Sequence, residues 1–407
     1  MQDKENKEKL NILVISQYYY PESFRINDVC ETLVNRGHDV TVITGLPNYP
    51  MGKISREYKF FRKRKEIING VNVIRSMEIG RHKGIIFRIL NYLSYMITAS
   101  FKTFFIGDKF DCVYVYEVSP VTMIVPGIMY KKRYKKPLIV YCLDLWPECV
   151  ETFGIKKNTK LYKWIEKFSK WVYSKADIIH TSSKTFISSL DEKIGKTIPK
   201  EYFPQYAEEY FKPNIKEENG QFDFVFAGNV GKAQSMETIV KVANRIKDIE
   251  NIKIHIVGDG TELANTEEAT KTLGLQNIIF YGRKKIEEMQ EYYNMADAMI
   301  VTLQKDDFAS STLPGKVQSY MATQKPIIAS ADGETKNIIE EAGCGLCTEA
   351  ENGEFLAESL KQFVELNKED RAKMGENSLK YYKENFEKNM FIKKLEESLR
   401  KEVANYV

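Results

Sequence analysis

The heptapeptide that ends at Lys316, SSTLPGK, has residue types that suit an anion site at the start of a helix. Pro314 fits the first turn of a helix running through Ala322, and the hydroxyls before it fit the cap. Backbone N–H groups of that turn, the hydroxyls of Ser311 and Thr312 and the Lys316 ammonium would together hold a diphosphate. A capped helix with a solvated lysine explains the same residues equally well.

Glycines follow two expected strands in the second half of the chain. A buried strand runs into Gly228-Asn-Val-Gly231, and the next one ends in Gly258-Asp-Gly260. Ser235 is the expected N-cap of the helix that follows the first glycine loop. Glycine allows a phosphate to approach backbone N–H groups, but tight turns also need glycine for backbone reasons alone. Each motif by itself is therefore a weak indication of a phosphate site.

Carboxylates and aromatic residues follow several expected strands in the first half. Glu117, Asp144 and Glu148 are candidates for acid/base or orienting roles. If the sheet is parallel, these loops open onto one crevice, together with Tyr18–Arg25 and Pro47–Pro50. Purely structural alternatives stay open. Asp144 would also suit a helix cap or a group that holds a loop in place, and Trp146 would suit packing alone.

The histidines and cysteines do not have metal-site spacing, so no metal and no cofactor is expected. His38, His82, His180 and His255 are scattered along the chain. Cys344 and Cys347 lack a second pair, which favours a loop followed by a strand over a redox or zinc site. The pair Asp306-Asp307 would need more oxygen ligands than its neighbours offer.

Short apolar runs alternate with amphipathic helical stretches along the 407 residues, which favours two α/β domains. Continuous apolar strands between helices predict parallel sheets covered on both faces, as in two Rossmann-like domains that face each other across a ligand-binding cleft. The expected strands are Asn11–Ser16, Asp39–Thr44, Val71–Arg75, Cys112–Tyr116, Leu138–Tyr141, Asp177–Thr181, Phe222–Ala227, Ile252–Val257, Ile278–Tyr281, Ala298–Leu303 and Ile327–Ala329.

An irregular stretch, Glu201–Gln221, is the expected interdomain linker. We therefore expect one domain over residues 1–205 and a second over residues 206–378. Residues 379–407 are expected to form a charged helix that packs back on the first domain.

Charge is divided unevenly between the two halves of the chain. Residues 1–200 carry 34 Lys and Arg against 20 Asp and Glu, whereas the remainder carries 26 against 36. Within the first half, Lys53–Lys109 places basic residues (Arg62–Lys65, Arg81, Lys83 and Arg88) beside apolar and aromatic ones, which suits an anionic lipid surface. A buried helix with a charged rim is the alternative. Nucleic acid is not expected, since no recognition motif is present.

No targeting or membrane-spanning segment is expected. Met1–Lys9 is polar and has no apolar h-region, and the apolar stretch Ile89–Phe101 is shorter than the roughly 20 residues of a membrane span. We expect a cytoplasmic protein that is attached peripherally to the inner face of the plasma membrane.

An ordered set of motifs spans nearly the whole chain and resembles one family. The chain resembles the retaining GT-B glycosyltransferases of family 4, in the branch that builds capsule, O-antigen and exopolysaccharide. The motifs are Gln17–Glu22, Gly37–Thr44, Leu46–Pro50, Asp144–Glu148, Ala227–Gly231 with Gln234, Val257–Gly260, and Pro314–Lys316 with Tyr320–Ala322.

The resemblance also exposes departures from the family pattern. The two glutamates that usually contact the donor sugar and ribose fall at Ser311 and Ser319, and the histidine that often precedes an Asp falls at Leu143. The arginine and lysine that usually grip the diphosphate fall near Asn229 and Gln234. Lys316, and after it Arg283, are then the expected cations.

The resemblance implies that the domain over residues 1–205 faces acceptor and membrane and that the domain over 206–378 binds the nucleotide-sugar. It also implies donor-binding, acceptor-binding and catalytic sets of residues. The donor set is Gly228, Asn229, Gly231, Gln234, Gly258, Gly282, Arg283, Ser311, Thr312, Pro314 and Ser319. The acceptor set is Tyr19, Glu22, Arg25, Asn48, Tyr49, Glu117 and Trp146. Asp144, Glu148 and Lys316 are the expected catalytic residues.

The implied reaction is transfer of a sugar, with retention, from a nucleotide-sugar to a glycan on a polyprenyl diphosphate. The expected donor is a UDP-sugar, with an N-acetylated deoxy-aminosugar among the candidates. Stabilisation of the leaving diphosphate would carry much of the catalysis. Two alternatives stay open: a nucleotide-sugar 2-epimerase of GT-B fold, and a non-catalytic partner in a glycan assembly complex.

Overall fold

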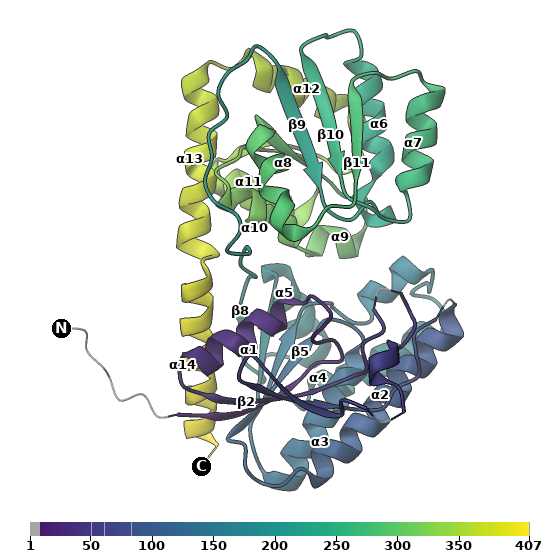
Figure 1. Cartoon of the computed structure of the whole chain (residues 1–407), viewed down its shortest axis with the longest axis vertical. Coiled ribbons are helices and arrows are strands. Elements are labelled where there is room, and N and C mark those ends of the chain that lie inside the picture. Colours follow the sequence, from purple (N-terminus) through teal and green to yellow (C-terminus); the bar gives the residue numbers. More distant parts are fainter. Residues whose placement is uncertain (1–8, 50, 61, 83, 407) are drawn as a thin grey trace, which may run out of the picture. The chain divides into compact units, whose positions relative to one another are not determined.

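The computed structural model describes residues 9–49, 51–60, 62–82 and 84–406, so the tail before Lys9, Pro50 and Lys83 lie outside the described residues. The chain divides into two compact units (Figure 1). The first unit consists of residues 1–182, 186–203 and 392–407. The second consists of residues 183–185 and 204–391. Each unit is described by itself.

The first unit is built on an eight-stranded sheet in the order β3-β4-β2-β1-β5-β6-β7-β8. All neighbouring strands are parallel except β3 and β4, which form an antiparallel hairpin. The strands are β1 Asn11–Ile15, β2 Asp39–Thr44, β3 Lys65–Ile68, β4 Val71–Arg75, β5 Cys112–Glu117, β6 Leu138–Cys142, β7 Ile178–Thr181 and β8 Lys200–Tyr202.

Helices cover this sheet and leave its central strands buried on both faces, as apolar parallel strands require. Helix α2 packs along α3, and both lie on one side of the sheet (Figure 1). The helices are α1 Arg25–Asn35, α2 Ile85–Phe105, α3 Val125–Tyr134, α4 Lys160–Tyr173, α5 Lys184–Ile194 and α14 Lys388–Asn405, with 3-10 turns η1 Arg56–Tyr58, η2 Val121–Ile124 and η3 Glu148–Phe153.

The second unit holds a six-stranded, all-parallel sheet in the order β11-β10-β9-β12-β13-β14. Its strands are β9 Phe222–Ala227, β10 Ile252–Val257, β11 Ile278–Gly282, β12 Ala298–Thr302, β13 Ile327–Ser330 and β14 Gly345–Thr348. Its helices are α6 Met236–Arg245, α7 Leu263–Thr272, α8 Met289–Met295, α9 Asp307–Ser311, α10 Gly315–Ala322, α11 Gly333–Ala342, α12 Gly353–Glu365 and α13 Lys368–Asn385, with 3-10 turns η4 Lys232–Gln234 and η5 Ile286–Glu288.

The end of α14 completes the first unit, which takes in the chain from Ile392 onward. Glu396 pairs with Arg36 at 2.9 Å and with His38 at 3.0 Å. Farther along the helix, Ser398 lies 2.8 Å from Nε2 of His180 on β7. Polar contacts from α14 thus reach α1, the start of β2 and β7.

Four local expectations need correction. Strands β3, β8 and β14 were not predicted, because each has few residues and no fully buried position. As a result, the expected linker at Glu201 begins with the last strand of the first sheet. The carboxy-terminal helical stretch is two helices, interrupted where Phe386 is buried. Pro314 lies at the N-cap of α10 rather than in its first turn.

Candidate active site

Two places in the sheets bring loops together at the carboxyl ends of strands. In each sheet the strand order reverses beside the first strand, between β1 and β5 in the first unit and between β9 and β12 in the second. Such switch points leave a crevice between loops that diverge to opposite faces. The ends of β1, β2, β5 and β6 and the loops after them carry the predicted acceptor residues, and those of β9, β10, β11 and β12 lead to the predicted donor residues.

Lys316 is the predicted diphosphate-binding cation of the second unit, and its side chain has defined contacts. It lies in the first turn of α10, half-buried, and its Nζ donates to Oε1 of Gln234 at 2.6 Å. The same nitrogen lies 3.8 Å from the centre of the Phe226 ring. Burial lowers the pKa of Lys316 to about 7, so neutral pH leaves the amine partly uncharged.

The loop after β9 leaves room for this lysine. A Cβ on Gly228 would lie 3.3 Å from Cε of Lys316, and the backbone there has φ of +134°. In the first turn of α10 the N–H of Val317 donates to the carbonyl of the N-cap Pro314 at 2.9 Å. The N–H groups of Gly315 and Lys316 precede this first bond of the helix, which makes the helix start a favourable place for an anion. Together, Lys316, Gln234 and the start of α10 form what we call the Lys316 cradle, and it can stabilise the charge of a diphosphate.

The glycines after β10 have a structural reason that does not involve a ligand. A Cβ on Gly258 would lie 1.8 Å from the carbonyl oxygen of Gly228, and one on Gly260 would lie 2.3 Å from that of Val230. The N–H of Gly258 donates to the oxygen of Gly282 at 3.0 Å. The backbones that follow β9, β10 and β11 are therefore in close contact at these glycines. This contact holds in place the loop after β9, which lies against Lys316.

Other predicted donor residues differ in what their side chains do. Ser311 and Ser319 are buried, and their hydroxyls donate to the carbonyls of Phe308 and Gly315 within their own helices. The hydroxyl of Thr312 likewise donates to the Phe308 carbonyl. Asn229 and Arg283 are exposed, and Gly231 lies close to the Asn229 amide. Arg283, directly after β11, therefore remains open to solvent.

Ser235 lies at the predicted N-cap of α6 but does not cap the helix with its side chain. Its backbone is left-handed with φ of 44°. Its hydroxyl lies 2.9 Å from the hydroxyl of Thr238. The expected hydrogen bond from a backbone N–H to Ser235 is thus replaced by a contact between two hydroxyls.

Asp144 follows β6 and is half-buried in the first unit. Burial raises its pKa to about 7, and a hydrogen bond with Ser119 opposes that shift. Ser119 also accepts from Nε1 of Trp146 at 3.1 Å, which ties these two loops together. Glu117, at the end of β5, is fully buried, and burial followed by the charge of Asp144 raises its pKa. The carboxyl group able to change its charge near neutral pH is therefore Asp144.

Glu148 differs from Asp144 because it has a cationic partner. Its Oε1 lies 2.5 Å from Nζ of Lys193, whose side chain is 9% exposed. This ion pair joins η3 to α5. Glu148 is thus held in a structural contact, whereas Asp144 forms no ion pair with a cation among the residues that the structure describes.

Several predicted acceptor residues hold loops in place. The Oε1 of Glu22 accepts from the backbone N–H groups of Asn48 and Tyr49 at 2.7 and 2.5 Å. Asn48 is buried, and its amide donates to Glu78 at 2.5 Å. The side chain of Tyr19 is 1% exposed, so it belongs to the core, and Arg25 is the half-buried first residue of α1.

Sequence reasoning missed the buried carboxyl at the centre of this network. Glu78 also accepts from Gln17 and from the backbone N–H of Leu46, and Gln17 donates to Asn91 on α2. Burial raises the pKa of Glu78 well above its usual range. A lone glutamate between β4 and α2 carries no motif, so only the fold reveals this role.

Tyr49 has a more exposed side chain than Asn48, the other predicted acceptor residue on the loop after β2. Its ring is 47% exposed and packs near the rings of Tyr18 and Phe24, at 5.8 and 5.6 Å between centres. The guanidinium of Arg81 lies 5.8 Å from the Tyr49 ring and 5.8 Å from the Tyr92 ring. An aromatic surface with a cation therefore lies beside the loops after β1 and β2.

Within the described ranges, no three His, Cys, Asp or Glu side chains gather as a metal site would require. Asp306 caps α9 by accepting from the N–H of Ala309 at 2.7 Å. Cys344 is buried ahead of β14, and Cys347 lies within that strand.

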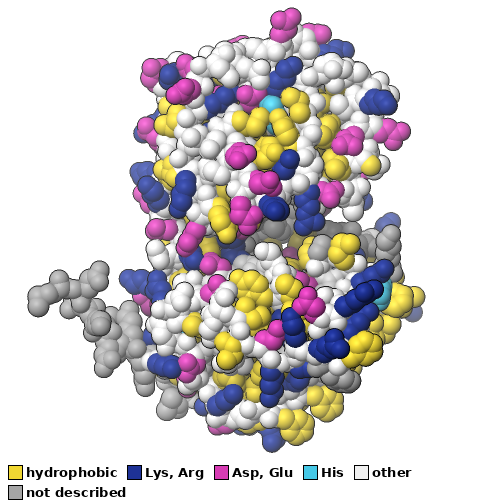
Figure 2. All heavy atoms as spheres, viewed as in Figure 1, with side chains coloured by type: hydrophobic (Ala, Val, Ile, Leu, Met, Phe, Trp, Pro, Cys, Tyr) yellow, Lys and Arg dark blue, Asp and Glu magenta, His cyan; other side chains and the backbone are white. Residues whose placement is uncertain are grey.

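Two helices of the first unit expose apolar stripes. On α2, Ile86, Leu90, Leu93, Ile97, Phe101 and Phe105 recur every three or four residues, and Phe101 is 64% exposed. On α4, Trp164 follows Leu161 by three residues and Trp171 follows Trp164 by seven, which places the three exposed side chains on one face of the helix. Figure 2 shows hydrophobic side chains beside Lys and Arg over the part of this unit drawn around α2. None of the helices formed by described residues has the length and apolar character of a bilayer-spanning segment.

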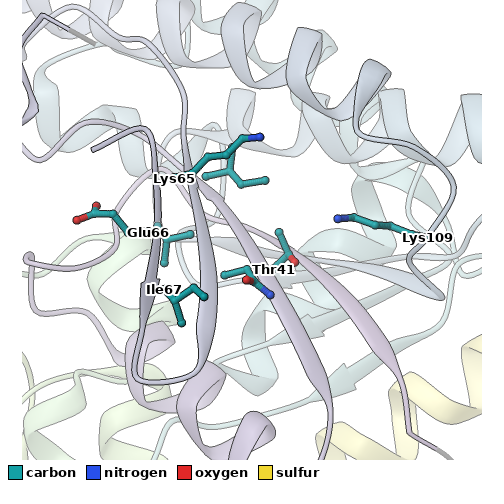
Figure 3. A pocket seen from close by; sticks show the side chains of 8 residues that line it. Thr41, Lys65, Glu66, Ile67 and Lys109 are labelled. Atoms are coloured by element: carbon teal, nitrogen blue, oxygen red, sulfur yellow. The ribbon is translucent and has the colours of Figure 1, made fainter. Parts of the chain in front are cut away.

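Cavities elsewhere do not contain the predicted site residues. One of about 380 Å³ lies on the first sheet, with Thr41, Lys65, Glu66, Ile67 and Lys109 among its lining (Figure 3). Lys65 comes from the edge hairpin, and Lys109 precedes β5. Another, also of about 380 Å³, adjoins α6 and α7 and includes Lys232, Ser235 and Glu262. Both differ from the loop clusters described above.

Comparisons with known proteins agree on one fold. Residues 207–381 match the family model described as glycosyl transferases group 1. Over 88% of its length the chain is 23% identical to the provisionally named colanic acid biosynthesis glycosyl transferase WcaI of Escherichia coli, covering 93% of that protein.

Solved structures resemble the chain over nearly its whole length. Sucrose-phosphate synthase of Thermosynechococcus elongatus has a TM-score of 0.78 at 14% identity, over 98% of this chain and 100% of the other. HepE of Anabaena, in complex with UDP and glucose, has a TM-score of 0.70 at 12% identity, over 96% of this chain and 99% of the other. The likeness shows the GT-B fold, as the sequence predicted.

Proposed function

We propose that this chain, a glycosyltransferase whose residues 207–381 form a group 1 glycosyl transferase domain, moves a sugar from a nucleotide-sugar to a membrane-bound, polyprenyl-diphosphate-linked glycan. The product is a surface polysaccharide precursor, and the donor is a UDP-sugar. The named relative in colanic acid biosynthesis and the UDP complex of HepE support these two assignments.

The Lys316 cradle is the observation that carries the proposal. A half-buried ammonium hydrogen-bonded to Gln234 at 2.6 Å, at the start of α10, suits the two phosphates that link nucleoside and sugar. As the sugar departs, negative charge builds on the diphosphate, and fixed donors stabilise it without reorganisation. Arg283 and the glycine loop after β9 contribute to holding the donor.

The transfer breaks the bond between the anomeric carbon and the diphosphate oxygen and forms one to an acceptor hydroxyl oxygen. The hydroxyl proton passes to the departing phosphate, and configuration at the anomeric carbon is retained. Asp144 accepts a hydrogen bond from the acceptor sugar and so positions it. Trp146 and Tyr49 provide apolar faces for sugar rings, while Glu148 keeps its loop in place through Lys193.

The membrane assignment has support in the surface of the first unit. Exposed stripes on α2 and α4 present large apolar side chains, and α4 carries lysines at positions 160, 163, 167 and 170 beside them. Apolar side chains enter the headgroup boundary while lysines meet anionic lipid. The enzyme then acts at the cytoplasmic face of the plasma membrane as a peripheral protein.

A thermal-shift panel of UDP-, GDP- and dTDP-sugars tests the donor assignment. A ligand that binds only the folded chain raises the melting temperature. We expect a shift with a UDP-sugar and none with Lys316→Met. A GDP- or dTDP-sugar that alone shifts the melting temperature would overturn the choice of UDP, and shifts that survive in Lys316→Met would overturn the role of the cradle.

A further inference from the structure

The segment before α2, in the first unit, holds a cationic group separate from the Lys316 cradle of the second unit. Arg81 belongs to this segment, and its backbone N–H donates to Oδ1 of Asn48 at 3.2 Å. Gly52 and His82 are joined by a backbone hydrogen bond of 2.8 Å, and a Cβ on Gly80 would lie 3.0 Å from the Gly52 oxygen. The loop after β2 therefore fixes the backbone of Arg81.

Two tyrosine rings define where the Arg81 side chain lies. Its guanidinium is 5.8 Å from the centre of each ring, Tyr49 on the loop after β2 and Tyr92 on α2. Contacts with aromatic faces hold a guanidinium in a defined orientation while its N–H groups stay available. Arg81 is half-buried, and so is Tyr92.

The nearby carboxyl group of Glu22 is occupied by other donors. Burial raises the pKa of Glu22, and the charge of Arg81 is among the effects that oppose this. Yet its Oε1 accepts backbone N–H groups from Asn48 and Tyr49. Arg81 thus brings positive charge to a site whose local acceptor already serves to hold a loop.

A second arginine and the predicted acceptor loop meet at Tyr92. Arg88 precedes Tyr92 by four residues on α2, so their side chains lie on one face of the helix. Burial raises the pKa of Tyr92, the charges of Arg81 and Arg88 lower it, and Cys149 and Asp144 raise it. The charges of both arginines and of Asp144 act on the Tyr92 hydroxyl, so Tyr92 lies near the Asp144 loop as well as near the arginines.

We propose that Arg81 and Arg88 bind the diphosphate of the lipid-linked acceptor, between the Asp144 loop and the apolar stripe of α2. A guanidinium binds phosphate oxygens through two parallel N–H donors, which fixes direction as well as position. The first sugar then points to Asp144 and the prenyl chain runs along Ile86 and Leu90. This inference rests on the proposed function and names the residues that select its acceptor class.

Farnesyl diphosphate is a probe with the same diphosphate and a short prenyl chain. Binding is measured by calorimetry on the full chain carrying Lys316→Met, which removes the competing cation of the second unit. We expect Arg81→Gln and Arg88→Gln each to weaken binding about tenfold, because each loses charge-assisted hydrogen bonds. Arg81→Lys should recover part of the loss, since it restores charge but not the planar fork. Arg56→Gln, at an exposed arginine of η1, is the matched control and should bind as its parent does.

Vesicles distinguish the carrier diphosphate from ordinary phospholipid headgroups. Sedimentation with phosphatidylglycerol and phosphatidylcholine vesicles should change less than about twofold in Arg81→Gln. An equal loss for vesicles and for farnesyl diphosphate would assign Arg81 to general headgroup contact and overturn the inference. Farnesol, which lacks the diphosphate, should bind all variants alike.

The remaining outcomes separate this inference from the proposed function. Unchanged farnesyl diphosphate binding in folded Arg81→Gln and Arg88→Gln overturns the inference and leaves a polyprenyl-diphosphate acceptor in place. Absence of binding in the parent, with sugar transfer to a glycan that lacks a diphosphate, overturns both. Circular dichroism melting curves establish that each variant is folded before it is compared.

Discussion

The ammonium nitrogen of Lys316 lies 2.6 Å from Oε1 of Gln234, although the two residues are 82 positions apart in the chain. This contact joins the helix after β12 to the loop after β9, across the switch point of the second sheet. Burial removes part of the water around the Lys316 ammonium, and Gln234 provides a hydrogen-bond acceptor in its place. A phosphate oxygen would replace or share that partner with a full opposite charge.

We predict that Lys316→Met loses nucleotide binding but not stability. The thermal shift produced by UDP should disappear, because the variant keeps the fold and lacks the cation. The unfolded chain holds a lysine with an ordinary pKa, and the folded chain lowers that pKa to about 7, so the lysine costs stability below pH 10. The melting temperature of the free variant at pH 7 should therefore equal or exceed that of the natural chain.

A matched control for this variant is Lys271→Met, at an exposed lysine in the last turn of α7. It should keep the full shift with UDP. Loss of the shift in both variants, or in neither, would contradict the role given to Lys316.

Binding of UDP should take up a proton between about pH 7 and 9. The free amine of Lys316 is largely neutral above its pKa of about 7, and a bound diphosphate favours the charged form. Affinity should therefore fall as pH rises through this range. Calorimetry in two buffers of different ionisation enthalpy measures the uptake, which should vanish in Lys316→Met. An uptake of equal size in that variant would assign the proton to another group.

Asp144 and Glu148 should respond differently to loss of charge. Asp144→Asn should lower kcat about 100-fold with an unchanged melting temperature or a higher one, because a buried carboxylate is removed. Glu148→Gln should leave activity within a few-fold but destabilise the chain by about 1–3 kcal/mol, because Lys193 loses its partner. Full activity of the double variant would exclude both from positioning the acceptor.

The pH dependence of activity provides a second test of Asp144. Burial raises its pKa to about 7, so the carboxylate that accepts the acceptor hydroxyl forms as pH rises from 6 to 8. At saturating donor, where the weaker donor affinity at high pH does not limit the rate, kcat should increase over that range in the natural chain. In Asp144→Asn the residual activity should lose this rise, whereas a rise of the same size would point to another group.

The apolar stripe of α2 should govern attachment to vesicles. Changing Ile97 and Phe101 together to serine removes two exposed side chains and should weaken binding to phosphatidylglycerol-containing vesicles about tenfold or more. Phe355→Ser, at a phenylalanine of α12 that is 60% exposed, is the control and should bind normally. Equal loss in both, or no loss in the double variant, would contradict a membrane role for this stripe.

The sequence was most informative where burial is continuous. Strands such as β2, β9 and β10 have the bounds that their apolar runs predicted, because a strand covered on both faces admits few polar residues. Edge strand β3 escaped notice since one face is open and its residues include Lys65 and Glu66. Whether such a segment forms an edge strand depends on its position in the sheet, and a short stretch of sequence does not contain that information.

The site residues also divide into those that local sequence patterns predict and those whose role only the fold reveals. The sequence indicated Lys316 because Pro314 and the hydroxyl residues before it are typical of the start of a helix. In the structure, Gln234 is a hydrogen-bond partner of Lys316. Glu78 was missed because its role arises from loops that converge only in the folded sheet. Ser311 and Ser319, placed by register alone, turn out to bond to their own helices. Sequence patterns therefore did not predict contacts between polar groups that are far apart in the chain and meet only in the folded structure.

The most direct measurement of the central claim is a crystal structure of the full chain soaked with UDP. The account predicts a β-phosphate oxygen within about 3 Å of Nζ of Lys316, with the second phosphate toward the start of α10. Nucleotide density at another surface of the second unit, with Lys316 still bonded only to Gln234, would contradict it.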